Sequence, residues 1–168
     1  CVAPDYVLVH KSVKDNLVEW VKKEIKLQYG GHALSNPDYG KIINKKHFER
    51  ILSLIDIEKV VYGGRSDSSS LQIEPTVMVD VTKEDRVMQE EIFGPILPIL
   101  QYYDINEAIE FIQKREHPLA LYVFSKPKNA KRIMERIGFG GGCINDTIIH
   151  LATSEMGFGG VGESGMGS

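Results

Sequence analysis

The amino-acid sequence predicts an α/β fold in three layers, with a largely parallel sheet that carries helices on both faces. The first observation is that the hydrophobic period switches repeatedly between that of a strand and that of a helix. The second is that strand and helix patterns alternate twice in the C-terminal half, which is typical of βαβ crossovers. The third is size, because 168 residues with 42% hydrophobic content support one packed core. Since no internal repeat or low-complexity linker interrupts the sequence, we expect residues 1–168 to form one domain.

The chain is expected to start with a strand and a long helix. Residues 6–10 form a β-branched and aromatic run suited to a strand. Ser12 then offers an N-cap with Asp15 three residues later, so a helix should begin there. Apolar side chains recur at every fourth position along it, and Gly30-Gly31 supplies its end. The helix therefore presents one apolar stripe to the core.

The middle of the chain predicts a helix and two strands. The pattern favours a helix over residues 45–55 and a short strand over 60–62. Residues 63–70 are expected to form a polar turn, and residues 75–81 alternate enough for a strand.

The second half repeats the alternation of strand and helix. Residues 96–102 predict a strand, and Asp104 with Glu107 makes a capping box for a helix that runs to residue 115. A strand over 119–124 follows. Ser125 with Pro127 then opens a helix that ends near residue 137. A glycine turn at 140–142 leads into a strand that contains Cys143, which we interpret as a small buried hydrophobic residue.

Composition and charge exclude several classes of function. The formal net charge of −3 gives no basic footprint of the kind that nucleic-acid binding needs. No apolar run approaches the roughly 20 residues of a membrane span, and the start has neither the basic n-region nor the apolar h-region of a signal peptide. Two cysteines are too few for a disulfide framework, which favours a reducing compartment and a cytoplasmic location. The five histidines show no ligand spacing, so we predict no metal site. His150 is expected to be a partly buried histidine with satisfied nitrogens, and the alternative is that it faces a substrate pocket.

The glycine-rich tail matches a dinucleotide-binding pattern twice, but its context argues against that function. Residues 157–162 and 160–165 both fit G-x-G-x-x-G. The Rossmann fingerprint also needs a preceding strand, a following helix and an acidic residue about 20 positions later. The printed sequence reaches only Ser168. We therefore predict a turning loop that brings backbone segments close together.

Several runs resemble the aldehyde dehydrogenases, and class 3 of that family in particular. They are CVAPDY at 1–6, EEIFGP at 90–95, INDT at 144–147 and FGGVGESGMG at 158–167, and the resemblance covers nearly the whole chain. It implies an NAD(P)-dependent oxidation of aliphatic or aromatic aldehydes to carboxylic acids in a homodimer. It also implies the catalytic-domain fold of that family.

The resemblance makes Cys1 the catalytic nucleophile. Its thiolate would add to the aldehyde, a hydride would leave to NAD or NADP, and water would release the acid from the resulting thioester. From position alone, a small buried hydrophobic residue is the alternative. Because the family places its general base, its oxyanion donor and most of its dinucleotide-binding domain before the thiol, and because the sequence begins with Cys rather than Met, we expect a C-terminal fragment of the catalytic domain that is inactive in isolation.

The resemblance assigns Glu91 and Phe93 to the cofactor and Phe158 to the substrate pocket. A carboxylate can accept both ribose hydroxyls, and an aromatic ring beside it can pack on the ribose or nicotinamide. Without the resemblance, residues 89–91 would be a solvated helix turn with Phe93 buried behind it, and Phe158 would anchor a loop in the core. The family commonly has Pro where this chain has Gly157, which leaves the rigidity of the pocket loop open.

A different class of enzyme remains as the alternative. An N-terminal Cys can serve an amidohydrolase of the N-terminal-nucleophile type, which uses its own α-amine as base. Such enzymes are sandwiches of antiparallel sheets, whereas this sequence alternates strands and helices. The preferred aldehyde, the choice between NAD and NADP, and membrane attachment are left open by the sequence.

Overall fold

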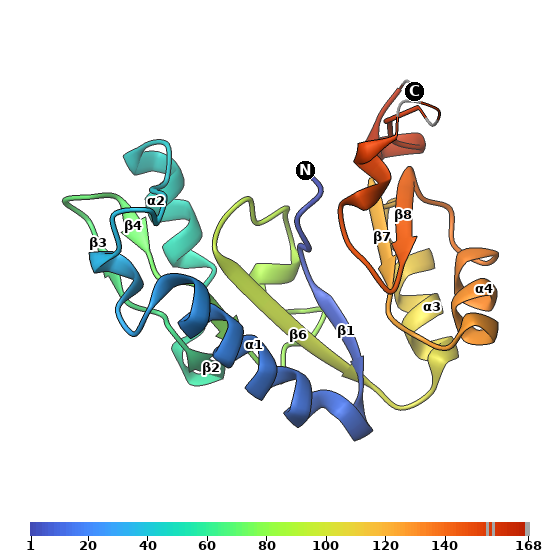
Figure 1. Ribbon diagram of the computed structural model, residues 1–168, viewed down its shortest axis with the longest axis horizontal. Helices are drawn as coiled ribbons and strands as arrows, with labels where there is room; N and C mark the ends of the chain where they lie inside the picture. The colour runs from blue at the N-terminus through green and yellow to red at the C-terminus, as the bar shows by residue number, and fades with distance from the viewer. Residues whose placement is uncertain (154, 156, 167–168) are drawn as a thin grey trace. The chain divides into compact units, whose positions relative to one another are not determined.

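The computed structural model describes residues 1–153, 155 and 157–166. The chain divides into two compact units, shown in Figure 1: unit 1 comprises residues 1–3 and 104–168, and unit 2 comprises residues 4–103. Both contain helices and parallel strands, which confirms the α/β prediction. The expectation of a single domain stays a prediction.

Unit 2 is built on a four-stranded sheet in the order β1-β6-β5-β2. Its strands are β1 Val7–His10, β2 Val60–Tyr62, β5 Thr76–Met78 and β6 Ile96–Tyr102. β1 and β5 both run parallel to β6, and only β2 is antiparallel to its neighbour β5. The sheet is thus largely parallel, which argues against the antiparallel sandwich of an N-terminal-nucleophile hydrolase.

The long helix of unit 2 is α1 Lys14–Tyr29, which lies along the sheet in Figure 1. Its Val18 joins Val9, Val77 and Ile99 in a buried cluster, and the predicted apolar stripe of α1 packs around this cluster. The predicted cap at Ser12 is wrong. A 3₁₀ turn, η1 Lys11–Val13, comes first, and the His10 side chain accepts from the Ser12 N–H, so the capping role falls two residues earlier.

The remaining predictions for unit 2 hold with shifted ends. α2 Lys45–Ser53 begins after Asn44, whose side chain accepts from the His47 N–H, and buries Phe48 and Ile51. The turn predicted at 63–70 contains β3 Ser66–Asp67, which pairs with β4 Gln72–Ile73. β5 is shorter than predicted because Asp80, two residues beyond its end, has φ +53°, which breaks the extended conformation.

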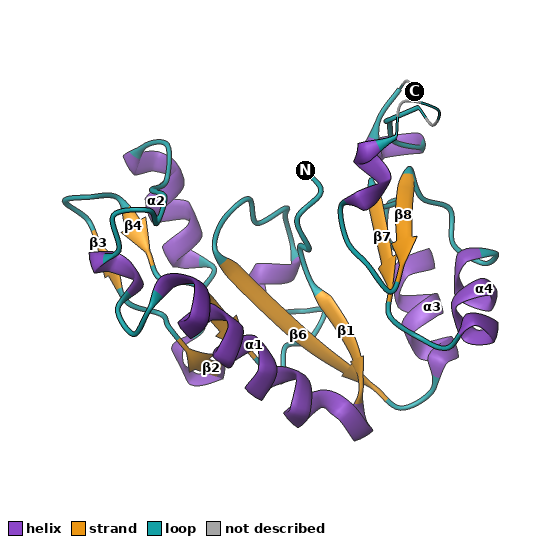
Figure 2. Cartoon of the chain, viewed as in Figure 1, coloured by secondary structure: helices purple, strands orange, loops and turns teal. Residues whose placement is uncertain are grey.

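Unit 1 contains a βαβ unit with one further helix. Its elements are α3 Ile105–Gln113, β7 Ala120–Val123, α4 Pro127–Met134 and β8 Gly141–Ile144, which Figure 2 shows as two strands with helices beside them. β7 and β8 are parallel. Asp104 is the N-cap of α3 as predicted, and its side chain accepts from the Asn106 N–H; the reciprocal bond from Glu107 that a capping box needs stays a prediction. The N-cap of α4 is Lys126 rather than Ser125, and α4 ends three residues earlier than predicted.

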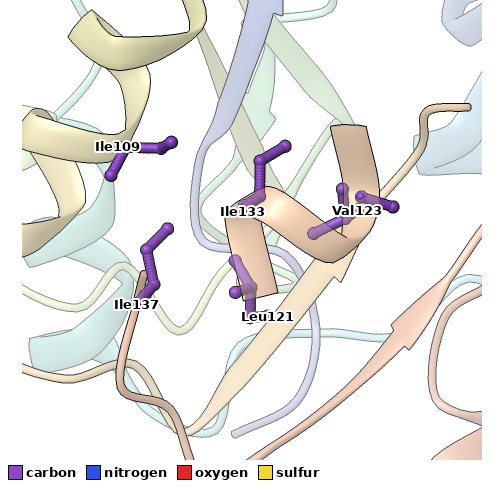
Figure 3. Close-up of a cluster of buried hydrophobic side chains, with 6 residues drawn as sticks. Ile109, Leu121, Val123, Ile133 and Ile137 are labelled. Atoms are coloured by element: carbon purple, nitrogen blue, oxygen red, sulfur yellow. The ribbon is translucent and has the colours of Figure 1, made fainter. Parts of the chain in front are cut away.

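The core of unit 1 lies between β7 and the two helices. Figure 3 shows its side chains, which come from α3, β7, α4 and the turn after α4: Ile109, Leu121, Val123, Ala130, Ile133 and Ile137. Strand residues alternate between faces, so Leu121 and Val123 point into this core and Tyr122 points to the opposite face. That opposite face carries part of the candidate site.

The described residues also contain several short 3₁₀ turns. They are η2 Ala33–Ser35, η3 Ile57–Lys59, η4 Arg86–Met88, η5 Ile149–Ala152 and η6 Gly162–Ser164. Among the described residues, no helix has the length and apolar character needed to cross a membrane.

Candidate active site

Cys1 belongs to unit 1 and presents an exposed free thiol. The carbonyl of the next residue, Val2, accepts a hydrogen bond of 2.8 Å from the Tyr122 hydroxyl. Because Tyr122 lies on β7, this bond ties the segment that carries the thiol to the strand pair of unit 1. The thiol remains open to solvent, as a nucleophile for a diffusing electrophile must be.

The run at 90–95 forms an irregular loop in unit 2, in which some side chains are buried and others are exposed. Ile92 is 1% exposed, whereas Phe93 is 64% exposed and Glu91 is exposed as well. The alternative of a helix with Phe93 buried is therefore wrong. Phe93 has φ +50°, a region that costs a non-glycine residue about 1–2 kcal/mol. Such strain in an exposed aromatic residue suggests a functional position.

Arg50 of α2 holds the backbone of this loop. Its Nη2 donates to the carbonyl of Ile92 at 2.6 Å, and its Nη1 donates to the carbonyl of Glu91 at 3.3 Å. The same Nη1 lies 3.4 Å from a carboxylate oxygen of Glu90. One guanidinium group thus constrains three consecutive loop residues, which restricts where the Glu91 and Phe93 side chains project.

Asp5 holds the loop from another segment of unit 2. Its carboxylate accepts the backbone N–H of Ile92 at 2.9 Å. Asp5 belongs to the run that starts at Cys1, and Ile92 belongs to the run at 90–95. Two of the runs that carry the family resemblance are therefore bonded to each other, although they are 87 residues apart in the sequence.

Gly94 allows the loop to pack closely on α2. A Cβ at this position would lie 2.7 Å from Cδ1 of Ile51, which is fully buried. Ordinary contacts between carbon atoms are about 3.5–4.0 Å. Close packing at Gly94 and the bonds from Arg50 and Asp5 together define the conformation of the loop.

The glycine-rich tail forms a turning loop, as predicted. A Cβ on Gly160 would lie 2.1 Å from the carbonyl oxygen of Ser164, and one on Gly140 would lie 2.2 Å from that of Gly159. Backbone thus packs directly against backbone in this part of unit 1. Phe158 is 55% exposed, so the alternative that it anchors the loop in the core is wrong, and its pocket role stays a prediction. Gly167 of this run lies outside the described residues.

The second cysteine is the buried residue that the sequence predicts. Cys143 on β8 is 7% exposed, and its Sγ lies 3.5 Å from Nδ1 of His150. Nε2 of His150 is buried and has no hydrogen-bond partner among the described residues. The expectation of a satisfied histidine thus fails for one ring nitrogen.

The four predicted site residues are divided between the units. Cys1 and Phe158 lie in unit 1, and Glu91 and Phe93 lie in unit 2. Within the described part of the chain, no group of three or more His, Cys, Asp or Glu residues could hold a metal ion.

The sequence analysis did not identify three residues that hold the backbone near Cys1 or the loop at 90–95. Asp5 stands within the run that begins at Cys1, so its charge in a mostly apolar stretch was an available signal. Arg50 and Tyr122 carry no comparable signal, because their spacing is that of ordinary helix and strand residues. Their roles depend on contacts with distant segments.

Comparison with known proteins supplies the family. The family model described as "Aldehyde dehydrogenase family" matches residues 1–168. The chain is 52% identical to 4,4'-diaponeurosporen-aldehyde dehydrogenase of Staphylococcus aureus over 99% of its own length. It is 50% identical to a dimeric NADP-preferring aldehyde dehydrogenase of Rattus norvegicus over its full length. The chain spans 37% of the length of each of these relatives.

A solved structure agrees with the described fold. The substrate-bound state of an AldH from Staphylococcus aureus matches with a TM-score of 0.96 and 50% sequence identity. That match covers 99% of this chain and 37% of the other chain. Further relatives include family 3 members A2 and B1, which agrees with the predicted class.

Proposed function

The chain belongs to the aldehyde dehydrogenase family, and we propose that the protein carrying it oxidises aldehydes to carboxylic acids with NAD or NADP as hydride acceptor. One observation carries this proposal: the runs that resemble the family present an exposed free thiol at Cys1 and exposed side chains at Glu91 and Phe93. The oxidations named for the relatives, and the NADP preference named for one of them, support the same reaction.

Cys1 performs the covalent chemistry in this proposal. Its thiolate attacks the carbonyl carbon of the aldehyde, which forms a C–S bond and a thiohemiacetal. Loss of a hydride from that carbon, together with loss of the hydroxyl proton to water, leaves a thioester on the Cys1 sulfur. Water then adds to the thioester carbonyl, the C–S bond breaks, and the carboxylic acid leaves while the thiol regains its proton.

Glu91 and Phe93 would hold the nicotinamide ribose, and the loop fits that role. Glu91 offers carboxylate acceptors for two hydroxyl groups, and the exposed ring of Phe93 offers a flat apolar surface. When bound, the nicotinamide accepts the hydride. The bonds from Arg50 and Asp5 keep both side chains oriented before the cofactor arrives, which lowers the entropic cost of binding.

The substrate side and the assembly complete the proposal. Phe158, exposed on the tail loop, would contact aliphatic or aromatic aldehydes. A homodimer is supported by the word "dimeric" in the name of the Rattus norvegicus relative. A reducing, cytoplasmic compartment is supported by the two free cysteines.

The experiment uses the whole polypeptide that carries this sequence. Turnover of aliphatic and aromatic aldehydes is followed by the absorbance of the reduced nicotinamide, with NAD and NADP supplied separately. Alkylation by iodoacetamide is followed in parallel by peptide mass spectrometry, and the buried Cys143 serves as an internal reference in the same molecule. We expect Cys1 to react first, and the lost activity to match the fraction of Cys1 that is modified.

Cys1→Ser should abolish turnover. An acyl adduct on the Cys1 peptide, trapped by acid quenching during turnover, would identify the thioester directly. Retained turnover in Cys1→Ser, or inactivation that follows Cys143 instead, would overturn the proposal.

A further inference from the structure

We propose that Tyr122 is a positioning residue for Cys1, acting through the carbonyl of Val2 and braced by His150. This inference rests on the proposed function, because it assumes that Cys1 is the nucleophile. The Tyr122 hydroxyl donates to the Val2 carbonyl at 2.8 Å across 120 residues of sequence. Peptide units are planar, so fixing the carbonyl of Val2 leaves few free torsions between that anchor and the Cys1 sulfur.

The strand places the Tyr122 hydroxyl where it can act. Along β7, Leu121 and Val123 enter the core of unit 1, so Tyr122 projects from the opposite face. A tyrosine hydroxyl is protonated at neutral pH and can donate its hydrogen. Burial raises the pKa of Tyr122 further, in the same direction. The donor is thus carried by a strand, which is more rigid than a loop.

His150 packs against the Tyr122 ring from the same face of the strand pair. In the β7–β8 register, Tyr122 is the partner of Cys143, and the ring centroids of Tyr122 and His150 are 5.8 Å apart. Nδ1 of His150 lies 3.5 Å from the Cys143 Sγ. A Cβ on Gly141 would lie 2.7 Å from Cδ2 of His150, so the glycine makes room for the imidazole. His150 in turn limits the movement of the Tyr122 ring.

Alkylation of Cys1 and hydride loss from its thiohemiacetal depend on geometry to different extents. Alkylation by a small reagent needs only an accessible thiolate. Loss of a hydride from the thiohemiacetal carbon needs that carbon to be aligned with the acceptor, and a misplacement of about 1 Å can cost about 100-fold in rate. Loss of a positioning bond should therefore slow turnover much more than alkylation.

The test compares Tyr122→Phe with Tyr39→Phe in the whole polypeptide. Tyr39 is the matched control, because its hydroxyl also donates to a backbone carbonyl, that of Ile73 at 2.6 Å, in unit 2. Each variant is assayed for kcat and KM with one aldehyde, for the iodoacetamide rate at Cys1, and for melting temperature. Activity is normalised to the fraction of folded protein, which is taken from the melting curve, so that misfolded protein does not lower the apparent kcat.

We expect Tyr122→Phe to lower kcat about tenfold, which corresponds to about 1.4 kcal/mol of barrier. KM and the alkylation rate of Cys1 should stay within about twofold of the parent protein, and Tyr39→Phe should keep the parent kcat. Gly141→Ala, which displaces His150 but keeps the Tyr122 hydroxyl, should lower kcat in the same way and to a smaller extent.

Two outcomes overturn the inference. Equal kcat values for Tyr122→Phe and Tyr39→Phe would show that the Val2 anchor does not matter for turnover. Equal losses of kcat and of alkylation rate would show a change in the thiol itself rather than in its placement. If the parent protein transfers no hydride, or if Cys1→Ser retains turnover, the proposed function itself fails. Either result can be distinguished from the two outcomes that overturn the inference about Tyr122.

Discussion

Replacing Gly94 with alanine is expected to destabilise unit 2 by about 1–3 kcal/mol, because the new methyl group meets the side chain of Ile51. The added Cβ would lie 2.7 Å from Cδ1, 3.1 Å from Cγ1 and 3.2 Å from Cγ2 of Ile51. These separations are up to about 1 Å shorter than an ordinary carbon contact. Ile51 is fully buried in close-packed surroundings, so it has little room to turn aside.

A double-mutant cycle tests this packing argument. Ile51→Val removes Cδ1, the nearest atom, and should cost about 0.5–1.5 kcal/mol by itself. In the double variant the methyl group introduced by Gly94→Ala has more room, so its cost should be about 1 kcal/mol smaller than in the parent background. The free energy of unfolding is measured by urea titration with circular dichroism, and the slope against urea should not change.

Gly31→Ala is the control, because a Cβ at Gly31 would meet no atom within 4 Å. Its effect should lie within about 0.5 kcal/mol. The reasoning is refuted if Gly94→Ala destabilises no more than Gly31→Ala, or if the two changes in the cycle are additive.

Three further predictions concern unit 2. Asp5→Ala should leave the buried N–H of Ile92 without its acceptor and destabilise the unit by about 1–3 kcal/mol. Hydrogen exchange at that amide should become faster, and unchanged exchange would contradict the role of Asp5. Burial alone would raise the pKa of Asp85, but hydrogen bonds from Lys59 and Thr82 outweigh it, so the net pKa lies below its ordinary value of 3.8. The Asp85 carboxylate therefore stabilises the fold above that pH, and the stabilisation is lost as the pH falls through the lowered pKa. Asp85→Asn should flatten this acid dependence in urea titrations at several pH values, and an unaltered profile would count against it. Phe93→Asn should leave the unfolding free energy unchanged or raise it, because Asn tolerates positive φ, while kcat/KM for aldehyde oxidation falls. A Phe93→Asn variant that loses stability but keeps its kcat/KM would contradict the proposed cofactor contact of Phe93.

Local patterns in the sequence were sufficient for most of the elements. The strand at 96–102, the cap at Asp104 and the helix α1 follow from side-chain periodicity and short-range hydrogen bonding. The predictions failed where two neighbouring side chains could cap the same turn. Ser12 was expected to be the N-cap of the first helix, but the His10 imidazole accepts the Ser12 N–H and caps the 3₁₀ turn before α1.

The family resemblance was also readable from the sequence, because its motifs are contiguous runs of residues. CVAPDY and EEIFGP keep their identity in any conformation, and they led to the family that the comparisons show. The same runs supplied Cys1, Glu91 and Phe93 as candidates.

Only the tertiary structure decided which side chains support these candidates. The bond from Ile92 to Asp5 spans 87 residues, and the bond from Tyr122 to Val2 spans 120 residues. No periodicity or short motif records such pairs, since they form only when distant strands and loops have packed. The exposure of Phe93 above a buried Ile92 has the same origin, because packing of Gly94 on α2 determines which side chain of the loop faces the solvent. The sequence alone thus determined the elements and the family of this protein, and long-range packing decided how its candidate catalytic residues are held.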